Sequence, residues 1–419
     1  MKIAFIFFLI FLYILAPRLN FPFPIHGGFL AVLLGFTFSY KNVYKAMSNL
    51  KIQAVLLIFI FFALYQLVFA VLYGHNPFYL LSIFISLSFS LIFSFAVPAK
   101  FFIQSSNNSD TNEVRISIFY KLMKMIVYVI FLNSLIIVVE FYFPSFRDFL
   151  EGMLVNNKNS NINYEEHAFR FRGFSASGGA SLSVINAVAV WLATMLCINN
   201  RLSNLRTILL IIVICASNIF TGRTGLIFSL LFGSFFLIYK YIPDLFRNGF
   251  RSLIANISIL TIVIYVLPQI QISDEILDWA FEWSDGLKTG NIDSGSTDEL
   301  KTMLFMPSNP FHLMFGVGYF EGTSGIYPRT DSGYLKTLFS FGFFWAACLY
   351  FLFFKLIFDI TKIDKELRSY IFPIIVFLLI VELKEPFIYQ NYLSRTLLLL
   401  IGSSIYLYQQ RKLNDSTYN

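Results

Sequence analysis

The chain of 419 residues is 57% hydrophobic and 19% aromatic but only 13% charged. A soluble domain carries about 25% charged residues, so this chain has too few charges to cover a surface exposed to water. Its composition excludes a soluble enzyme, a disordered protein and a secreted disulfide scaffold, and it disfavours a β-barrel, whose strands alternate apolar and polar residues.

The apolar residues lie in runs close to the thickness of a bilayer. They predict an all-α polytopic integral membrane protein with about twelve transmembrane helices in a single domain, 1–419. We interpret the N-terminal run as a first span rather than a signal peptide, because Pro17 follows it and no small-residue cleavage site is present. The expected spans are 3–16, 27–40, 52–73, 78–97, 122–143, 180–198, 207–220, 225–240, 252–269, 332–355, 370–383 and 396–409.

The basic residues predict an orientation. One set of loops and chain ends carries 19 of the 31 Lys and Arg residues and 7 of the 24 acidic residues, a net charge of +12. The opposite set has a net charge of −5. Because cytoplasmic loops carry the excess of Lys and Arg, we expect a protein of the bacterial inner membrane with both termini in the cytoplasm. The overall charge of +7 reflects these loops, and no nucleic-acid partner is expected.

Two loops on the outer side are long, 144–179 and 270–331, and are expected to be periplasmic with short helices. In the second, Ser273 is expected to cap a helix that places Ile276, Trp279, Ala280 and Trp283 on one face. This helix either lies at the membrane interface or packs against the protein. The segment 296–299 is a capping box that predicts another short helix. The cytoplasmic loops are short and no GxxxxGK[ST] motif occurs, so chemistry is expected on the outer face.

The three cysteines and four histidines show no metal-ligand spacing, so neither a metal site nor a cofactor is expected. The arginines of the outer side are more informative. Arg170 and Arg172 lie beside Gly173, and forked donors together with exposed backbone N–H groups suit a phosphate or diphosphate. The alternative is contact with lipid headgroups.

A second arginine motif, Thr221–Gly225, lies between two expected spans. Its Arg223 is close to the start of a helix, where the helix dipole favours an anion. The alternative is a simple interfacial turn.

The last two polar motifs combine acidic residues with arginines. Asp331 follows Arg329 at the start of an expected span, where a carboxylate can accept a proton from a sugar hydroxyl. Its alternative role is to cap that helix. Glu382, Glu385 and Arg395 surround the last outer turn, where charges face a polar cavity or a partner, or form a structural ion-pair network.

With these motifs in this order, the chain resembles Wzy-type O-antigen polymerases, within the O-antigen ligase/polymerase group. An R-x-x-G-F segment is matched by Arg170–Phe174, and an arginine turn by Thr221–Gly225. Ligase relatives carry His, then Asn, Ser or Gln, then nine residues and Gly; here Asp331, Ser332 and Gly342 have that spacing. The Asp in place of His argues against a ligase.

The resemblance implies a GT-C-like, metal-independent glycosyltransferase. It would transfer a glycan from undecaprenyl diphosphate to the terminal sugar of an undecaprenyl-diphosphate-linked repeat unit. The expected base is Asp331, and Arg170, Arg172, Arg223, Arg329 and Arg395 are expected to bind the substrate, with Arg170, Arg172, Arg223 and Arg395 converging on one outer cavity. The expected partners are these lipid-linked glycans, membrane lipids, and the chain-length regulator and flippase of the same pathway.

Two alternatives to the polymerase remain open. One is an O-antigen ligase, and the other is a lipid-linked oligosaccharide flippase or transporter. A flippase would place arginines along a cavity within its spans. Here they lie at span ends and in outer loops, which favours surface chemistry.

Overall fold

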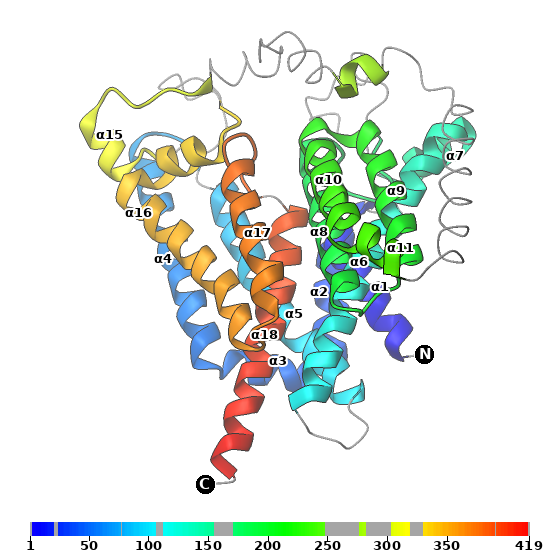
Figure 1. The fold of residues 1–419 in the computed structure, drawn as a ribbon. Helices are drawn as coiled ribbons and strands as arrows, with labels where there is room; N and C mark the ends of the chain where they lie inside the picture. Colours follow the sequence, from blue (N-terminus) through cyan, green and yellow to red (C-terminus); the bar gives the residue numbers. More distant parts are fainter. Residues whose placement is uncertain are drawn as a thin grey trace. The chain divides into compact units, whose positions relative to one another are not determined.

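The computed structural model describes residues 2–20, 24–76, 78–105, 112–154, 171–247, 276–281, 303–318, 330–389 and 391–417. This part of the chain is almost entirely helical (Figure 1). Its only sheet is an antiparallel ribbon of β1 (Arg18–Asn20) and β2 (Pro24–His26). The prediction of an all-α protein is therefore confirmed.

Seven stretches of the described chain are long and apolar enough to cross a membrane. They are Leu50–Leu72, Leu80–Ile103, Ile116–Tyr142, Ala180–Ile198, Asn204–Thr221, Arg223–Arg247 and Gly333–Lys362, and three shorter apolar helices are Ile3–Leu15, Gly27–Phe38 and Leu367–Val381. A multi-pass membrane protein is thus supported. The number of about twelve spans stays a prediction, since the expected span 252–269 lies outside the described residues.

The chain divides into two compact units, of which the first combines Met1–Val129 with Gly295–Asn419. Besides the ribbon and the first part of α6 (Asn112–Tyr142), it contains α1 (Lys2–Leu15), α2 (Gly27–Phe38), α3 (Tyr40–Met47), α4 (Leu50–Leu72), α5 (Phe78–Ser105), α15 (Pro310–Phe315), α16 (Gly333–Phe358), a 3-10 turn (Asp359–Lys362), α17 (Leu367–Val381) and α18 (Asn391–Thr417).

The core of this first unit forms where α18 packs along α5. The Tyr406 ring lies 5.4 Å from Phe95 and 5.8 Å from Phe102, centroid to centroid. α1 joins the same core, because the buried Tyr13 hydroxyl lies 3.1 Å from Ser94 Oγ on α5. The C-terminal end of α1 thereby lies beside the N-terminal end of α18.

The second unit, Ile130–Ser294, contains the rest of α6, α7 (Pro144–Met153), α8 (Ala180–Ile198), α9 (Asn204–Thr221), α10 (Arg223–Phe236), a π-helical segment (Leu237–Tyr241) and α11 (Ile242–Arg247). Buried amides link its helices. Asn186 on α8 donates to Asn218 on α9 at 2.9 Å, and Asn218 donates to Ser229 Oγ on α10 at 2.7 Å. Hydrogen bonds between buried polar side chains inside a membrane protein specify which helix faces meet.

Most expected spans coincide with helices, and 180–198 coincides with α8. The expected span 27–40 is shorter, because α2 ends at Phe38 and the amphipathic α3 begins at Tyr40. Residues 276–281 are helical, with Ile276 and Ala280 buried on one face as predicted, and Asp278 is exposed. Ser273, Trp283 and the capping box 296–299 lie outside the described residues.

Candidate functional site

Arg395 is a buried cation one turn into α18. Its side chain is 6% exposed, Nη1 donates to the Tyr13 carbonyl at 3.3 Å, and the guanidinium lies 5.9 Å from the centre of the Tyr13 ring. Within the described part of the chain it forms no salt bridge. Burying a charge without a counter-charge is costly, so this position is suited to an anionic ligand.

The ribbon pairs Arg18 with His26, and His26 is close enough to both Arg18 and Arg395 to feel their charges. The Cα atoms of Arg18 and His26 are direct partners in the β1–β2 register, and side chains of directly opposed residues share one face of a ribbon. Arg18 Nε is buried and has no hydrogen-bond partner among the described residues. The ribbon thus contributes a second guanidinium with an unused donor.

His26 is neutral at pH 7. Burial, and then the charges of Arg395 and Arg18, lower the pKa of its imidazole to about 4. Its Nδ1 accepts a hydrogen bond from Phe29 N at 3.4 Å as the N-cap of α2. This bond assigns the remaining proton to Nε2, so His26 offers a further donor without adding charge.

Gly28 brings the start of α2 against Arg395. A Cβ at this position would lie 2.7 Å from Arg395 Nη1, so a larger residue would move the guanidinium from its place on the first helical turn. The backbone N–H groups of that turn are positive and partly unpaired. We call Arg18, His26, Gly28 and Arg395 the donor cluster; a phosphate or diphosphate is the ligand that such a set recognises.

The loop that leads to α18 carries a buried acidic residue, Glu382, which we call the acidic centre. Glu382, directly after α17, is fully buried, accepts a hydrogen bond from Phe387 N at 2.7 Å and another from the Tyr350 hydroxyl. Its carbonyl accepts from Gly333 N at 2.9 Å. The Glu382 side chain is therefore held by neutral donors.

Asp331 is half-buried, two residues before the start of α16. The N-cap of α16 is Ser332, with φ −61° and ψ 121°. The alternative that Asp331 caps this helix is therefore wrong. Because Gly333 N donates a hydrogen bond to the Glu382 carbonyl, Asp331 lies next to the acidic centre. It also lies next to the loop that leads to α18 and Arg395.

The spacing from Asp331 to Gly342 has a structural reason. Gly342 has φ +74° inside α16, where the helix kinks, and a Cβ there would lie 2.2 Å from the Met314 carbonyl of α15. A left-handed conformation with close backbone contact requires glycine. The kink sets the direction of the first two turns of α16, which begin beside Asp331.

Arg172 already has a partner. It is 4% exposed, and its Nε donates to Glu151 Oε1 at 3.0 Å while Nη2 bonds the other carboxylate oxygen. The neighbouring Gly173 N donates to Glu140 at 3.0 Å. A diphosphate would have to displace Glu151 from the fork. Binding of substrate by Arg172 stays a prediction, and the observed contacts hold Arg172 and Gly173 against α7 and α6.

Arg223 begins α10, and its guanidinium lies 4.9 Å from the centre of the Trp279 ring. The glycine after it serves helix packing. Gly225 N donates to Ser183 Oγ on α8 at 3.2 Å, and a Cβ on Gly225 would lie 2.0 Å from the Ser183 carbonyl. The second glycine of the arginine turn is therefore explained without a ligand.

Arg170 and Arg329 lie outside the described residues. Arg395 belongs to the first unit, whereas Arg172 and Arg223 belong to the second. Their expected convergence on one cavity therefore stays a prediction. Sequence reasoning missed His26, Glu140 and Glu151 as members of these clusters. Glu140 carried a signal, because a carboxylate inside the expected span 122–143 is costly and marks a polar contact.

Comparisons with protein-family models, with curated proteins and with solved structures find no match for this chain. Function must therefore be argued from the residues and their geometry.

Proposed function

We propose that the chain is a polymerase of lipid-linked surface glycans of the O-antigen type, a metal-independent glycosyltransferase with a GT-C-like arrangement of spans. It transfers the growing glycan from undecaprenyl diphosphate to the terminal sugar of an undecaprenyl-diphosphate-linked repeat unit at the periplasmic face. The chain-length regulator and the flippase of the same pathway are its proposed partners.

The observation that carries this proposal is the buried Arg395, which has no acidic partner among the residues that the structure describes. Arg18 Nε, the neutral His26 and the start of α2 add donors around it. A diphosphate is a strong acceptor with several oxygens, and the first unit supplies several donors from the β1–β2 ribbon, α2 and α18. Arg170, Arg172, Arg223 and Arg329 remain proposed substrate ligands.

The reaction requires that the protein stabilise the leaving group and provide a base. The bond between the anomeric carbon of the donor glycan and the diphosphate oxygen breaks, and the electron pair leaves with the diphosphate. Guanidinium groups stabilise this developing charge. A new bond forms between the anomeric carbon and the acceptor hydroxyl, whose proton is transferred to a base. Asp331 is the proposed base.

A gene deletion separates the proposed function from its alternatives. Loss of a polymerase leaves lipopolysaccharide capped with a single repeat unit, whereas loss of a ligase or a flippase leaves no repeat unit on it. We expect the deletion strain to show the single-repeat band on a gel, and the chain supplied from a plasmid to restore the ladder. Absence of the single-repeat band would exclude the polymerase.

The donor cluster is then tested in the same strain. Arg395→Lys retains a charge but loses the forked donors, so we expect ladders reduced to the single-repeat band at normal protein level. A full ladder from both Arg395→Lys and Arg395→Gln would remove this cluster from the reaction.

A further inference from the structure

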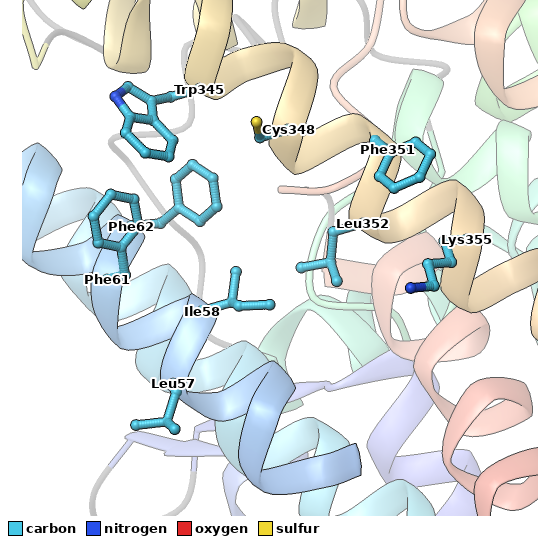
Figure 2. Close-up of a pocket in the computed structure, with 9 residues that line it drawn as sticks. All are labelled: Leu57, Ile58, Phe61, Phe62, Trp345, Cys348, Phe351, Leu352 and Lys355. Atoms are coloured by element: carbon cyan, nitrogen blue, oxygen red, sulfur yellow. The ribbon is translucent and has the colours of Figure 1, made fainter.

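An apolar groove runs along the lipid-facing side of the first unit. It lies between α4 and α16 and has a volume of about 450 Å³ (Figure 2). Leu57 and Phe61 on α4, and Trp345 and Phe351 on α16, line it. Leu57 is 66% exposed and Phe351 70%, so the groove is open to the surrounding hydrocarbon. Its volume is in the range of ligand pockets.

The two ends of the groove differ in chemistry. At one end the rings of Phe61 and Trp345 meet, with centroids 4.7 Å apart. At the other end Lys355 lines the groove (Figure 2). Ten residues of helix separate Trp345 from Lys355, a distance of about 15 Å along the axis. This is about half of a bilayer core of about 30 Å, so the groove has the length of one leaflet.

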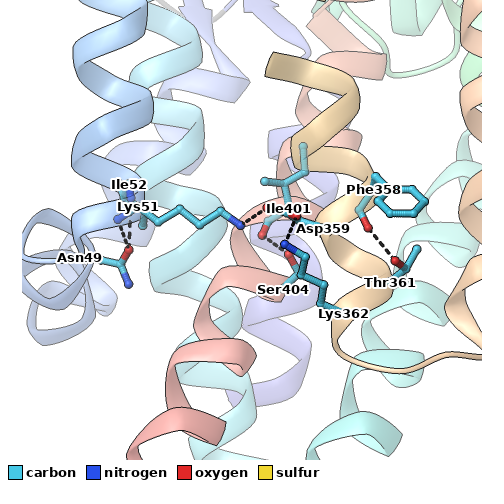
Figure 3. Close-up of polar contacts among 9 residues, drawn as sticks. All are labelled: Asn49, Lys51, Ile52, Phe358, Asp359, Thr361, Lys362, Ile401 and Ser404. Atoms are coloured by element: carbon cyan, nitrogen blue, oxygen red, sulfur yellow. Dashed lines mark hydrogen bonds and ion pairs between the residues drawn. The ribbon is translucent and has the colours of Figure 1, made fainter. Parts of the chain in front are cut away.

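Lys355 also lines an adjoining basic pocket of about 290 Å³. There Asp359, which is 8% exposed, accepts from Lys51 Nζ at 2.6 Å and from Lys362 Nζ at 2.7 Å (Figure 3). One carboxylate thus faces three lysines, and the pocket keeps a net charge of +2. Within the described part of the chain, Lys355 has no ion-pair partner.

We propose that the groove and the basic pocket together bind one anionic phospholipid. An acyl chain lies between α4 and α16, and the phosphate headgroup lies against Lys355, with Lys51 and Lys362 beside it. The occupant follows from charge and length: a positive pocket at headgroup level continues into an apolar groove one leaflet long. Basic pockets between transmembrane helices bind anionic headgroups in this way.

This lipid site is independent of the proposed glycan chemistry. Lys51, Lys355 and Lys362 belong to the side that the charge pattern assigns to the cytoplasm, whereas the donor cluster belongs to the outer side. A free phosphate would use the lysines but not the groove, and a zwitterionic lipid would leave the net positive charge of the pocket uncompensated. An anionic lipid uses both parts.

Quenching of Trp345 by brominated lipids tests the proposal on the full chain. Phe replaces Trp191, Trp279 and Trp283, which leaves Trp345 as the only fluorescent tryptophan. The protein is reconstituted in phosphatidylcholine vesicles that contain either phosphatidylglycerol or phosphatidylcholine brominated on the acyl chain, at equal mole fraction. Brominated phosphatidylglycerol is expected to quench Trp345 more strongly.

Lys355→Ala is expected to lower the preference for phosphatidylglycerol about fivefold, as for one lysine near an anionic headgroup. Lys365→Ala is the matched control, because Lys365 is an exposed lysine of the same side outside both pockets. It should keep the preference. Equal quenching by the two lipids, or an equal loss in both lysine variants, would overturn the proposal.

Native mass spectrometry provides a second readout that needs no tryptophan substitution. The otherwise unchanged chain, released from micelles with added phosphatidylglycerol, should retain one lipid molecule, and Lys355→Ala should lose it while Lys365→Ala keeps it. Retention of phosphatidylglycerol by Lys355→Ala at the original level would contradict the assignment of this pocket.

Discussion

Arg395 shows how one residue can indicate a ligand. Taking a guanidinium out of water costs several kcal/mol unless a counter-charge or a set of hydrogen bonds offsets it. Its Nη1 contact to the Tyr13 carbonyl, at 3.3 Å, and the Tyr13 ring offset part of this cost. Neutral His26 fits the same interpretation, since a protonated imidazole between two guanidinium groups would be repelled. The residues fit a site that is completed by an anion.

Asp331 leads to the most direct test of the reaction. Asp331→Asn keeps the shape of the side chain but removes the proton acceptor, so polymerisation should fall about 100- to 10,000-fold, the usual cost of losing a general base. On a gel of lipopolysaccharide the ladder should collapse to the single-repeat band, with unchanged protein level. Because Ser332 occupies the N-cap of α16, loss of a helix cap does not explain such a result.

The control for this variant is Asp148→Asn, which changes an acidic residue on α7 whose side chain is 76% exposed. It should give a normal ladder. If Asp331→Asn also gives a normal ladder, Asp331 is not the base, and the next residues to substitute are Glu382 and Glu385 on the loop before α18.

At the scale of elements, the donor cluster depends on the contact of α2 with α18. Gly28→Ala places a methyl group 2.7 Å from the present position of Arg395 Nη1 and so displaces the guanidinium. Misplacement of a charged group by about 1 Å can cost about 100-fold in rate. We therefore expect a strongly shortened ladder, although alanine by itself favours a helix over glycine.

Gly152→Ala is the matched control, because Gly152 lies in α7 and a Cβ there meets nothing within 4 Å. Both variants make the same chemical change in a helix. Equal ladders from the two would show that the position of Arg395 does not matter for the reaction.

The sequence predicted elements well where apolar runs are uninterrupted, and poorly where polar residues continue a helix. The run 180–198 matches α8 residue by residue. By contrast, α6 begins at Asn112, ten residues before the expected span, because charged residues such as Glu113 and Lys121 are good helix formers that hydropathy does not count. α7 is a short helix of the kind expected in the loop 144–179, but its bounds were not predicted, since its apolar face is short.

At the scale of the whole chain, the candidate site was predicted only in part. Arg395 and Asp331 were chosen from their position at span ends, a local property of the sequence. The pairing of Arg18 with His26, and the contact of Gly28 with Arg395, join positions up to hundreds of residues apart. Hydrophobic periodicity carries no information about such pairs, so they became visible only in the folded chain.

The orientation of the chain in the membrane is the last prediction, and both proposed sites depend on it. The charge difference between the two sets of loops predicts that reporter fusions at Asn159 and Gly290 are periplasmic and that fusions at Asn108 and Lys362 are cytoplasmic. Alkaline phosphatase should be active only at the first pair, and a fluorescent reporter that folds only in the cytoplasm only at the second. Lys362 is the most informative position. It lies in the basic pocket, after the C-terminal end of α16, whereas Asp331 lies before the N-terminal end of the same helix. A periplasmic Lys362 would place Asp331 in the cytoplasm, away from any periplasmic glycan. It would also put the lysine pocket in the outer leaflet. Both results would contradict the orientation predicted from the charge pattern.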